Sequence, residues 1–434
     1  MKSFLLVVAT FFPLVHPDLL TKINKDKIPE ENAVSEKEAE WRLKAIRKLW
    51  SERQSMGRTP LIRFSPRGLP NSDIFLKNET ATKTRTLKHR FVWALVLWAI
   101  TEGKVTSNTS AVYDSTSGNT GASEAYMCSL IGVPYVAVVA DNLETEKVRQ
   151  IESFGGKIMK VPVSDRNKRA KEEAKKTGGF YINQFGNAER AEEYHESGSF
   201  HYESTNVFHE ILAQFEEDKL QKAKVPDYFV HSAGTGGTIS SVGRYIVRYG
   251  MPTRVVLADS QYSLFYDYVI NNRFTNQSGA GIWTPPGIAG IGYGYDIEPV
   301  WYGDTTSLVR HVVNEAMKMP DVATVAALHE LNGRGLNVGP STALNYLVSL
   351  YQAYKQRHSS ISKRLTIVTI ACDPGDFYRS TYLNSTWVDA SLGKSGGMKS
   401  VKCWREVIVN AMDKGSDFLG QGLTKCYGNF QSSL

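Results

Sequence analysis

Apolar residues recur with two different periods along the first half of the chain. Short runs rich in Val, Ile, Ala and Tyr, typical of buried strands, alternate with longer stretches that have the apolar spacing of amphipathic helices. The runs predict strands at 74–76, 111–113, 135–140, 157–161 and 180–182, and helices at 91–103, 122–131, 144–154 and 166–176. This alternation of strand and helix predicts a parallel sheet that is covered by helices on both faces.

A second series of the same kind follows. It predicts strands at 228–230, 255–258 and 365–370 and helices at 239–249 and 343–354. We therefore expect an α/β fold of two three-layer domains with mostly parallel sheets, a smaller one over residues 59–187 and a larger one over 188–390. The stretch 261–302 is rich in Tyr, Gly and Pro and lacks helical periodicity, and so long a loop inside a domain is usually functional, which makes it a candidate lid.

The two ends of the chain depart from this pattern. Residues 1–20 combine a lysine near the start with an apolar run of about a dozen residues, which is the outline of a signal peptide, although no small-x-small cleavage site follows. Residues 21–58 contain strong helix formers with apolar residues at helical spacing and predict an amphipathic helix that needs a partner surface. After a glycine-rich linker at 393–397, the tail of the segment 391–434 is expected to be a weakly helical appendage.

Composition excludes some classes of function. The 434 residues are 42% apolar and 22% charged, as in an ordinary globular protein. The net charge of +7 is dispersed, so we expect no nucleic-acid partner. The N-terminal apolar run is shorter than the roughly 20 residues that cross a bilayer, so we expect no membrane span. The location stays open between export, if residues 1–20 are a signal, and the cytoplasm.

The four cysteines show no Cys-x-x-Cys pair and no metal-ligand spacing, so we expect no metal site. Cys128 and Cys372 fall in apolar helix and strand patterns and are expected to be inert core thiols. Cys403 and Cys426 could pair if the protein is exported. Four sequons would then become possible glycan acceptors, at Asn78, Asn108, Asn276 and Asn384.

Lys88 is the first candidate for chemistry. It stands in a polar stretch that runs straight into an apolar helix, next to the cations Arg85, His89 and Arg90. Neighbouring cations and an apolar wall both oppose protonation of an amine, and a free amine attacks a carbonyl to form a Schiff base. The alternative is an ordinary solvated lysine at the start of a helix.

Three loops could hold anionic groups. The polar segment 114–121 joins a strand to a helix, and its hydroxyls and helix-start N–H groups suit a carboxylate, although a plain N-cap turn would look alike. The glycine-rich segment 234–238 also joins a strand to a helix, and such loops can cradle a phosphate. Ser341 opens a third helix and, taken alone, would be a simple N-cap.

In this order the motifs resemble those of the fold-type II pyridoxal-phosphate enzymes, the cysteine synthase and cystathionine β-synthase family with a tryptophan synthase β-like fold. That family carries Ser-x-Lys-Asp-Arg, Thr-Ser-Gly-Asn-Thr-Gly and Gly-Thr-Gly-Gly-Thr. This chain has Thr86-Leu87-Lys88-His89-Arg90, then the second motif unchanged at 116–121 and the third unchanged at 234–238. The resemblance runs from about residue 59 to residue 388 and implies pyridoxal phosphate as cofactor and a homodimer.

The resemblance also implies a role for each matching residue. Lys88 would hold the cofactor as a Schiff base and move the substrate Cα proton, Asn119 would contact the cofactor's ring oxygen, and Ser341 would face its pyridine nitrogen. The other residues fall into two groups, a phosphate loop made of Gly234, Thr235, Gly236, Gly237 and Thr238, and a substrate-carboxylate site made of Thr116, Ser117, Thr120 and Gln184.

Within the family, further segments look most similar to the L-cysteine desulfhydrases. These are Lys88-His89-Arg90, 290–292, 320–327 and 338–342. The similarity implies β-elimination from L-cysteine, a small-molecule amino-acid substrate, with release of sulfide, pyruvate and ammonia. β-Replacement of the cysteine synthase or cyanoalanine synthase type stays open. A regulator that binds the cofactor without turnover also stays open, because Lys83-Thr84-Arg85 stands where these enzymes have Pro-Thr-Gly.

Overall fold

The computed structural model describes residues 34–188, 190–191, 206–272, 286–294, 306–357 and 364–426. The expected leader at 1–20 lies outside these residues, as do the sequon at Asn276 and parts of the stretch 261–302. No helix within these residues is long and apolar enough to cross a bilayer.

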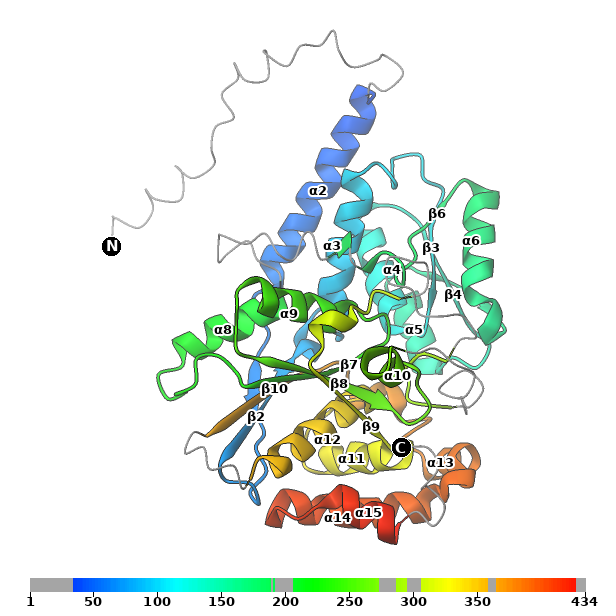
Figure 1. Cartoon of the computed structure of the whole chain (residues 1–434). Coiled ribbons are helices and arrows are strands. Elements are labelled where there is room, and N and C mark those ends of the chain that lie inside the picture. The colour runs from blue at the N-terminus through cyan, green and yellow to red at the C-terminus, as the bar shows by residue number, and fades with distance from the viewer. Residues whose placement is uncertain are drawn as a thin grey trace.

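The larger of two sheets has six strands (Figure 1). In spatial order these are β1 (Leu61–Arg63), β2 (Ser72–Asn78), β10 (Leu365–Ala371), β7 (Tyr228–Ser232), β8 (Arg254–Ser260) and β9 (Glu315–Met319). Neighbouring strands are parallel except at the edge, where β1 is antiparallel to β2. Strand β10 lies at the centre, with Ile367 opposite Ile74 of β2 on one side and Tyr228 of β7 on the other.

Both faces of this sheet are covered, because successive side chains of a strand point to opposite faces. Val230 and Ile367 pack in the core that contains α11 (Asp321–Gly333) and α12 (Pro340–Lys355). Their neighbours Phe229 and Val368 pack in a second core with α8 (Val207–Glu217), α9 (Gly237–Arg248) and α10 (Phe265–Ile270). The strands are therefore apolar on both faces, as the continuous apolar runs predict.

The smaller sheet has four parallel strands. They are β5 (Lys157–Val161), β4 (Tyr135–Ala140), β3 (Val112–Thr116) and β6 (Phe180–Tyr181). The core on one face includes residues of α3 (Lys88–Thr101), α4 (Asn119–Ile131) and α5 (Thr145–Ser153), and α6 (Arg166–Thr177) contacts the strands from the other face. The N-terminal helix α2 (Glu36–Met56) packs on α3 and α4 (Figure 1). Short 3-10 turns join these elements, at η3 (Glu79–Ala81), η4 (Val163–Asp165), η6 (Arg310–Val312), η7 (Gly375–Tyr378) and η8 (Gly393–Ser395).

The predicted fold class, with parallel sheets between layers of helices, is confirmed. The predicted boundary at residue 59 is wrong in one respect, because β1 and β2 pair within the larger sheet and not within the smaller one. The reason is a long-range pairing, since β2 lies beside β10, which follows almost three hundred residues later along the chain. The pattern also missed α8, β9 and α11.

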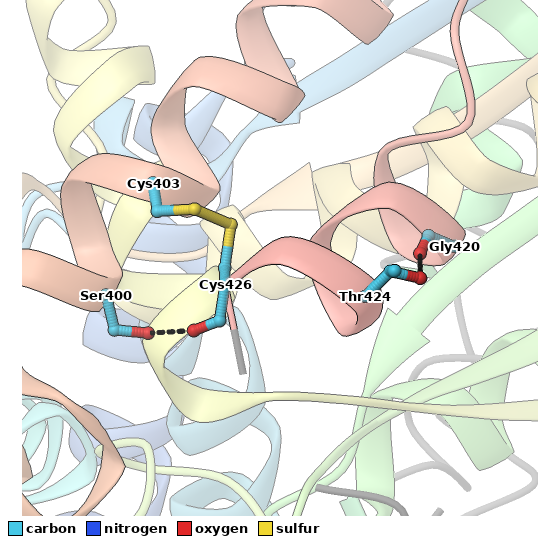
Figure 2. Close-up of a disulfide and its surroundings, with 5 residues drawn as sticks. All are labelled: Ser400, Cys403, Gly420, Thr424 and Cys426. Carbon is cyan, nitrogen blue, oxygen red and sulfur yellow. Dashed lines mark hydrogen bonds between the residues drawn. A yellow bond between two sulfur atoms is a disulfide. The ribbon is translucent and has the colours of Figure 1, made fainter. Parts of the chain in front are cut away.

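The C-terminal region is strongly helical and part of the core, so the expectation of a weakly helical appendage is wrong. After α13 (Ser385–Leu392), the residues expected to form a linker, 393–397, form η8 and the start of α14 (Gly397–Lys414). Helix α14 packs on α11, and α15 (Phe418–Lys425) packs on α14. Trp404 and Phe418 are completely buried there. Cys403 and Cys426 form a disulfide with a Cα–Cα distance of 5.6 Å that ties the end of α15 to α14 (Figure 2). Beside it, the Ser400 hydroxyl donates a hydrogen bond to the Cys426 carbonyl.

A buried ion-pair network fixes the start of α3 to its surroundings. Arg90 of α3 donates to both carboxylate oxygens of Glu79 in η3, at 3.0 and 3.2 Å, and to Glu210 of α8 at 2.6 Å. Lys77 at the end of β2 adds a 2.9 Å ion pair to Glu210. Arg53 of α2 lies 3.6 Å from the same carboxylate. Five elements are thereby tied together two residues away from Lys88.

Arg85 stands where the family pattern that the sequence resembles has a glycine. Its φ of 58° lies in the left-handed region, which a glycine adopts without strain. The guanidinium of Arg85 pairs with Asp376 of η7 at 2.8 Å and lies 5.5 Å from the centre of the Phe377 ring. The ion pair thus holds a strained backbone in the conformation that the loop before Lys88 requires.

We predict that Arg85→Gly is more stable than Arg85→Ala by about 1 kcal/mol, because both variants lose the ion pair but only glycine removes the left-handed strain. Urea midpoints of the two variants would measure this, since both variants lack the ion pair and differ only in the backbone strain. Equal stability of the alanine and glycine variants would show that Arg85 is not strained.

Candidate active site

A cavity of about 760 Å³ lies where strands of both sheets end. Its lining includes residues that directly follow β3, β7 and β10. Ligands of open α/β sheets bind at such carboxyl ends of strands. Ten of the predicted site residues line this one cavity, namely Lys88, Ser117, Asn119, Thr120, Gln184, Gly234, Thr235, Gly236, Thr238 and Ser341. The fold therefore gathers at one place segments that are far apart in the sequence.

Lys88 is the first residue of α3 and not part of a preceding loop. Its pKa lies below the ordinary value, and loss of hydration on burial is the main cause. Cys372, Glu124 and Asp373 act in the opposite direction and favour the ammonium. The Nζ atom lies 5.5 Å from the centre of the Phe91 ring, which provides the apolar wall that the sequence predicts.

The predicted role of neighbouring cations in lowering the pKa of Lys88 is wrong. Arg90 points into the network with Glu79 and Glu210, and Arg85 pairs with Asp376. The His89 ring lies 3.0 Å from a carboxylate oxygen of Glu52. On a helix, adjacent residues point in different directions, so sequence neighbours are not spatial neighbours. Burial alone accounts for the lowered pKa of Lys88.

The carboxylate-type loop between β3 and α4 has an ordered interior. Ser117 is exposed to the cavity, and the Thr120 hydroxyl donates to Gln184 Oε1 at 2.6 Å. Gln184 in turn donates through Nε2 to the carbonyl of Ser115 at 2.8 Å. Thr116 differs from the prediction, since it is buried and does not line the cavity. Its Oγ1 accepts the N–H groups of Gly118 and Gly121, so the side chain closes the turn.

The glycine-rich loop leads into α9 and packs tightly against the backbone of Gly290 and Leu308. A Cβ at Gly234 would lie 2.3 Å from the carbonyl oxygen of Gly290, and one at Gly236 would lie 2.3 Å from the Leu308 nitrogen. Gly236 also has a φ of 86°. Gly237 is buried inside the first turn and does not line the cavity. The first N–H groups of a helix have no partner within it, so the loop and the helix start present donors to an anion.

Asn119 lies at the edge between the two sheets. Its Nδ2 donates to Asp373, after β10, at 2.7 Å. Among the described residues, its buried Oδ1 has no hydrogen-bond partner. The Asp373 carboxylate lies so close to the backbone of residue 339 that only glycine fits there, because a Cβ at Gly339 would lie 2.0 Å from Asp373 Oδ1. Burial raises the pKa of Asp373.

A pair of buried carboxyl groups lies behind the carboxylate-type loop. Burial raises the pKa of Asp114 on β3 to about 7, and burial together with the charge of Asp114 raises that of Glu124 on α4. Tyr135 donates to Glu124 at 2.6 Å, and the Gln184 N–H donates to Asp114. The protein therefore avoids a full negative charge next to a site for a carboxylate.

Several cavity residues were missed from the sequence. His231 and Ser232 end β7, and Cys372, expected to be an inert core thiol, lines the cavity after β10. Burial raises the pKa of the Cys372 thiol to about 12, so the group is neutral. Arg166 at the start of α6 also lines the cavity and donates to the Thr116 carbonyl at 3.1 Å. These residues could have been found from the sequence, because polar residues at the carboxyl ends of predicted strands are candidates for a ligand site.

The stretch predicted as a lid contributes to the cavity where it is described. Pro286 and residues 288–294 are part of the lining, and Gly292 donates a backbone hydrogen bond to Ala233, next to the glycine-rich loop, at 2.7 Å. The same stretch contains a helix, α10, that the missing periodicity did not predict.

These features fit pyridoxal phosphate. The volume is within the range of ligand sites, about 300–1,000 Å³. The loop at Gly234 and Gly236 suits a phosphate, Lys88 offers an amine of lowered pKa, and Asn119 Oδ1 lacks a partner that a ring hydroxyl could supply.

Comparison with known proteins agrees with this fit. Residues 52–373 match the family model described as pyridoxal-phosphate dependent enzyme. A pyridoxal-phosphate dependent protein of Caenorhabditis elegans is 70% identical over 414 residues, which are 95% of each chain. The L-cysteine desulfhydrase of Mycobacterium tuberculosis is 33% identical over 362 residues, 81% of this chain and 90% of that protein.

More distant relatives share the fold. Cysteine synthase B of Campylobacter jejuni is 26% identical over 76% of this chain and 96% of its own length. The crystal structure of O-ureido-L-serine synthase superimposes with a TM-score of 0.62 at 24% identity and covers 76% of this chain and 94% of its own. The chain therefore belongs to the family of pyridoxal-phosphate-dependent enzymes, among relatives of the cysteine synthase and desulfhydrase group, and its cofactor is pyridoxal phosphate.

Proposed function

We propose that this protein converts L-cysteine and water into hydrogen sulfide, pyruvate and ammonia by β-elimination. The choice of this reaction is supported by sequence identity, which is 33% to an L-cysteine desulfhydrase and 26% to cysteine synthase B. All the residues that line the cavity fall within the part of the chain that matches the family model, residues 52–373. A homodimer, which the family resemblance implies, is part of the proposal.

In this proposal the glycine-rich loop holds the cofactor phosphate through backbone N–H groups, with Thr235 and Thr238 beside it. Asn119 would contact the ring oxygen, and Lys88 would hold the cofactor through its amine. When bound, the cofactor supplies an electron sink for the bond that is broken. The roles of Thr116 and Gly237 become indirect, because both shape their loops without lining the cavity.

The substrate would be oriented by its carboxylate. Ser117, Thr120 and Gln184 lie on one side of the cavity, and the Thr120–Gln184 hydrogen bond fixes two of the three. Lys88 Nζ, as a free amine, removes the Cα proton as a general base and can return it as a general acid. Ser341 offers a neutral hydroxyl to the ring nitrogen and not a carboxylate, which favours rapid loss of a β leaving group.

β-Replacement is the second candidate. It is supported by the cysteine synthase relatives and by the similarity of fold to O-ureido-L-serine synthase. The two reactions share the proton transfer and differ in whether water or a second nucleophile enters the cavity, which would depend on the stretch that includes residues 286–294. A cofactor-binding regulator without turnover is the third candidate.

Lys88→Ala is expected to lower kcat by about 10³-fold or more and to abolish the borohydride-fixed cofactor adduct, since a proton transfer and the covalent link are lost together. Burial lowers the pKa of Lys88, so its reactive free amine persists at lower pH. In cofactor-free protein, Lys88 should therefore react with an acylating reagent at lower pH than Lys168, whose side chain is 78% exposed. A reducible adduct at another lysine would disprove the assignment.

With L-cysteine alone, the enzyme should form sulfide, pyruvate and ammonia in equal amounts. Ser117→Ala should lower this rate by about 10²-fold, because the carboxylate is misplaced, whereas Ser129→Ala on the exposed side of α4 should not change it. Coupled assays of the three products measure the reaction. If O-acetylserine and sulfide give cysteine much faster than cysteine gives pyruvate, the replacement reaction takes the place of elimination.

We also propose that the protein is exported. The Cys403–Cys426 disulfide supports this, because disulfides persist in oxidising compartments. The disulfide closes a loop with a sequence separation of 23 and should raise the free energy of unfolding by about 3 kcal/mol. The double variant Cys403→Ser/Cys426→Ser should lose this amount of stability. Mass spectrometry of the native protein should find the disulfide, a start beyond residue 20 and a glycan at the exposed Asn108. An intact leader with both thiols reduced would contradict export.

A further inference from the structure

His231 is a titratable side chain of the cavity that the mechanism above does not use. It is the fourth residue of β7, three residues before the glycine-rich loop, and its side chain lines the cavity although the residue is only 3% exposed. The Phe229 ring lies 5.9 Å from the imidazole, centre to centre. A buried polar ring at this place needs a hydrogen-bond partner for each nitrogen.

Asn345 of α12 supplies one of these partners. Its Nδ2 lies 3.2 Å from Nδ1 of His231 and 3.7 Å from the Cys372 sulfur. An amide nitrogen donates hydrogen bonds and does not accept them, so in this arrangement, which leaves the buried Asn345 Oδ1 without a partner among the described residues, Nδ1 accepts and is the unprotonated nitrogen of the ring. The proton of a neutral imidazole is then on Nε2, and among the described residues Nε2 has no hydrogen-bond partner.

The charges around His231 keep the imidazole neutral. Burial and the nearby ammonium form of Lys88 lower the pKa of His231 to about 3. Asn345 is uncharged, and the thiol of Cys372 on β10 is neutral because burial raises its pKa. Glu124 and Asp373, which act on Lys88, also have raised pKa values. A carboxylate in place of Asn345 would instead favour an imidazolium.

We propose that His231 is a positioning residue, whose Nε2–H donates a hydrogen bond to an oxygen of the ligand that lies beside Lys88 in the cavity. The inference rests on the proposed function only in that the cavity binds the cofactor and an amino acid. A neutral donor orients the ligand without placing a positive charge beside the Lys88 amine. Asn345 acts through His231, because it selects the nitrogen that carries the proton.

The first experiment follows His231 directly in the full chain without cofactor. In a sample with ¹⁵N-labelled histidine, His231 is assigned among the 9 histidines by the signal that is lost in His231→Gln. We expect the Nε2–H tautomer and no titration between about pH 5 and 8. Adding pyridoxal phosphate, and then L-cysteine, should shift the Nε2–H signal. A protonated Nδ1, an ordinary titration or an unchanged signal would overturn the proposal.

The second experiment compares variants. His231→Leu removes the donor and should raise the dissociation constant of pyridoxal phosphate or of L-cysteine about 10-fold, the usual effect of one hydrogen bond to a charged group. His231→Gln keeps an N–H donor and should restore most of the affinity. The exposed His311 gives the control His311→Leu, which should bind like the wild type. Equal binding by the leucine and glutamine variants would overturn the proposal even if both fold normally.

Asn345→Asp tests the tautomer with a side chain of the same shape. It should raise the pKa of His231 into the measurable range and make ligand binding depend on pH where the wild type does not. An unchanged His231 signal in this variant would overturn the role of Asn345. The NMR and binding measurements need no turnover, so a wild type without desulfhydrase activity would refute the proposed reaction and leave the result for His231 intact.

Discussion

The position of Lys88 depends on the buried contact between Arg90 and two glutamates. Arg90 reaches Glu79 after β2 and Glu210 on α8, so one guanidinium ties the start of α3 to the larger sheet and its covering helix. These charges are almost completely buried, and the attraction of Arg90 lowers the pKa of Glu210 to about 2. A buried pair adds little net stability, but removal of one partner is costly because a charge is left unpaired. The network therefore specifies one arrangement of the two sheets.

That arrangement places Lys88 among buried groups whose charged forms are disfavoured by burial. The Cys372 thiol and the His231 ring are uncharged, and burial raises the pKa values of Glu124 and Asp373. An ammonium would lose its hydration there, and this loss outweighs the opposite effect of Cys372, Glu124 and Asp373, so the pKa of Lys88 is lowered. The property that makes Lys88 useful for chemistry comes from the cavity and not from its sequence neighbours.

The C-terminal helices stabilise the side of the larger sheet that is remote from α9. Helix α14 packs on α11, and Trp404 and Phe418 extend the core formed by α11 and α12. The disulfide ties α15 to this layer (Figure 2). Through α12, which carries both Ser341 and Asn345, the same layer borders the cavity. A region that lies outside the matched family segment therefore supports residues that line the site.

The sequence by itself determined most strands, most helices and the three motifs, because apolar periodicity and turn chemistry are local. It also placed Lys88, Asn119 and Ser341 correctly in one site through the resemblance. Only the tertiary structure decided that β2 joins β10, that Thr116 turns inward, and that Arg85 pairs with Asp376. Strand pairing, side-chain direction and burial each depend on residues distant along the chain, which periodicity does not report. For the same reason His231, a polar residue at the end of an apolar strand, became a candidate only when α12 and α3 were seen beside it.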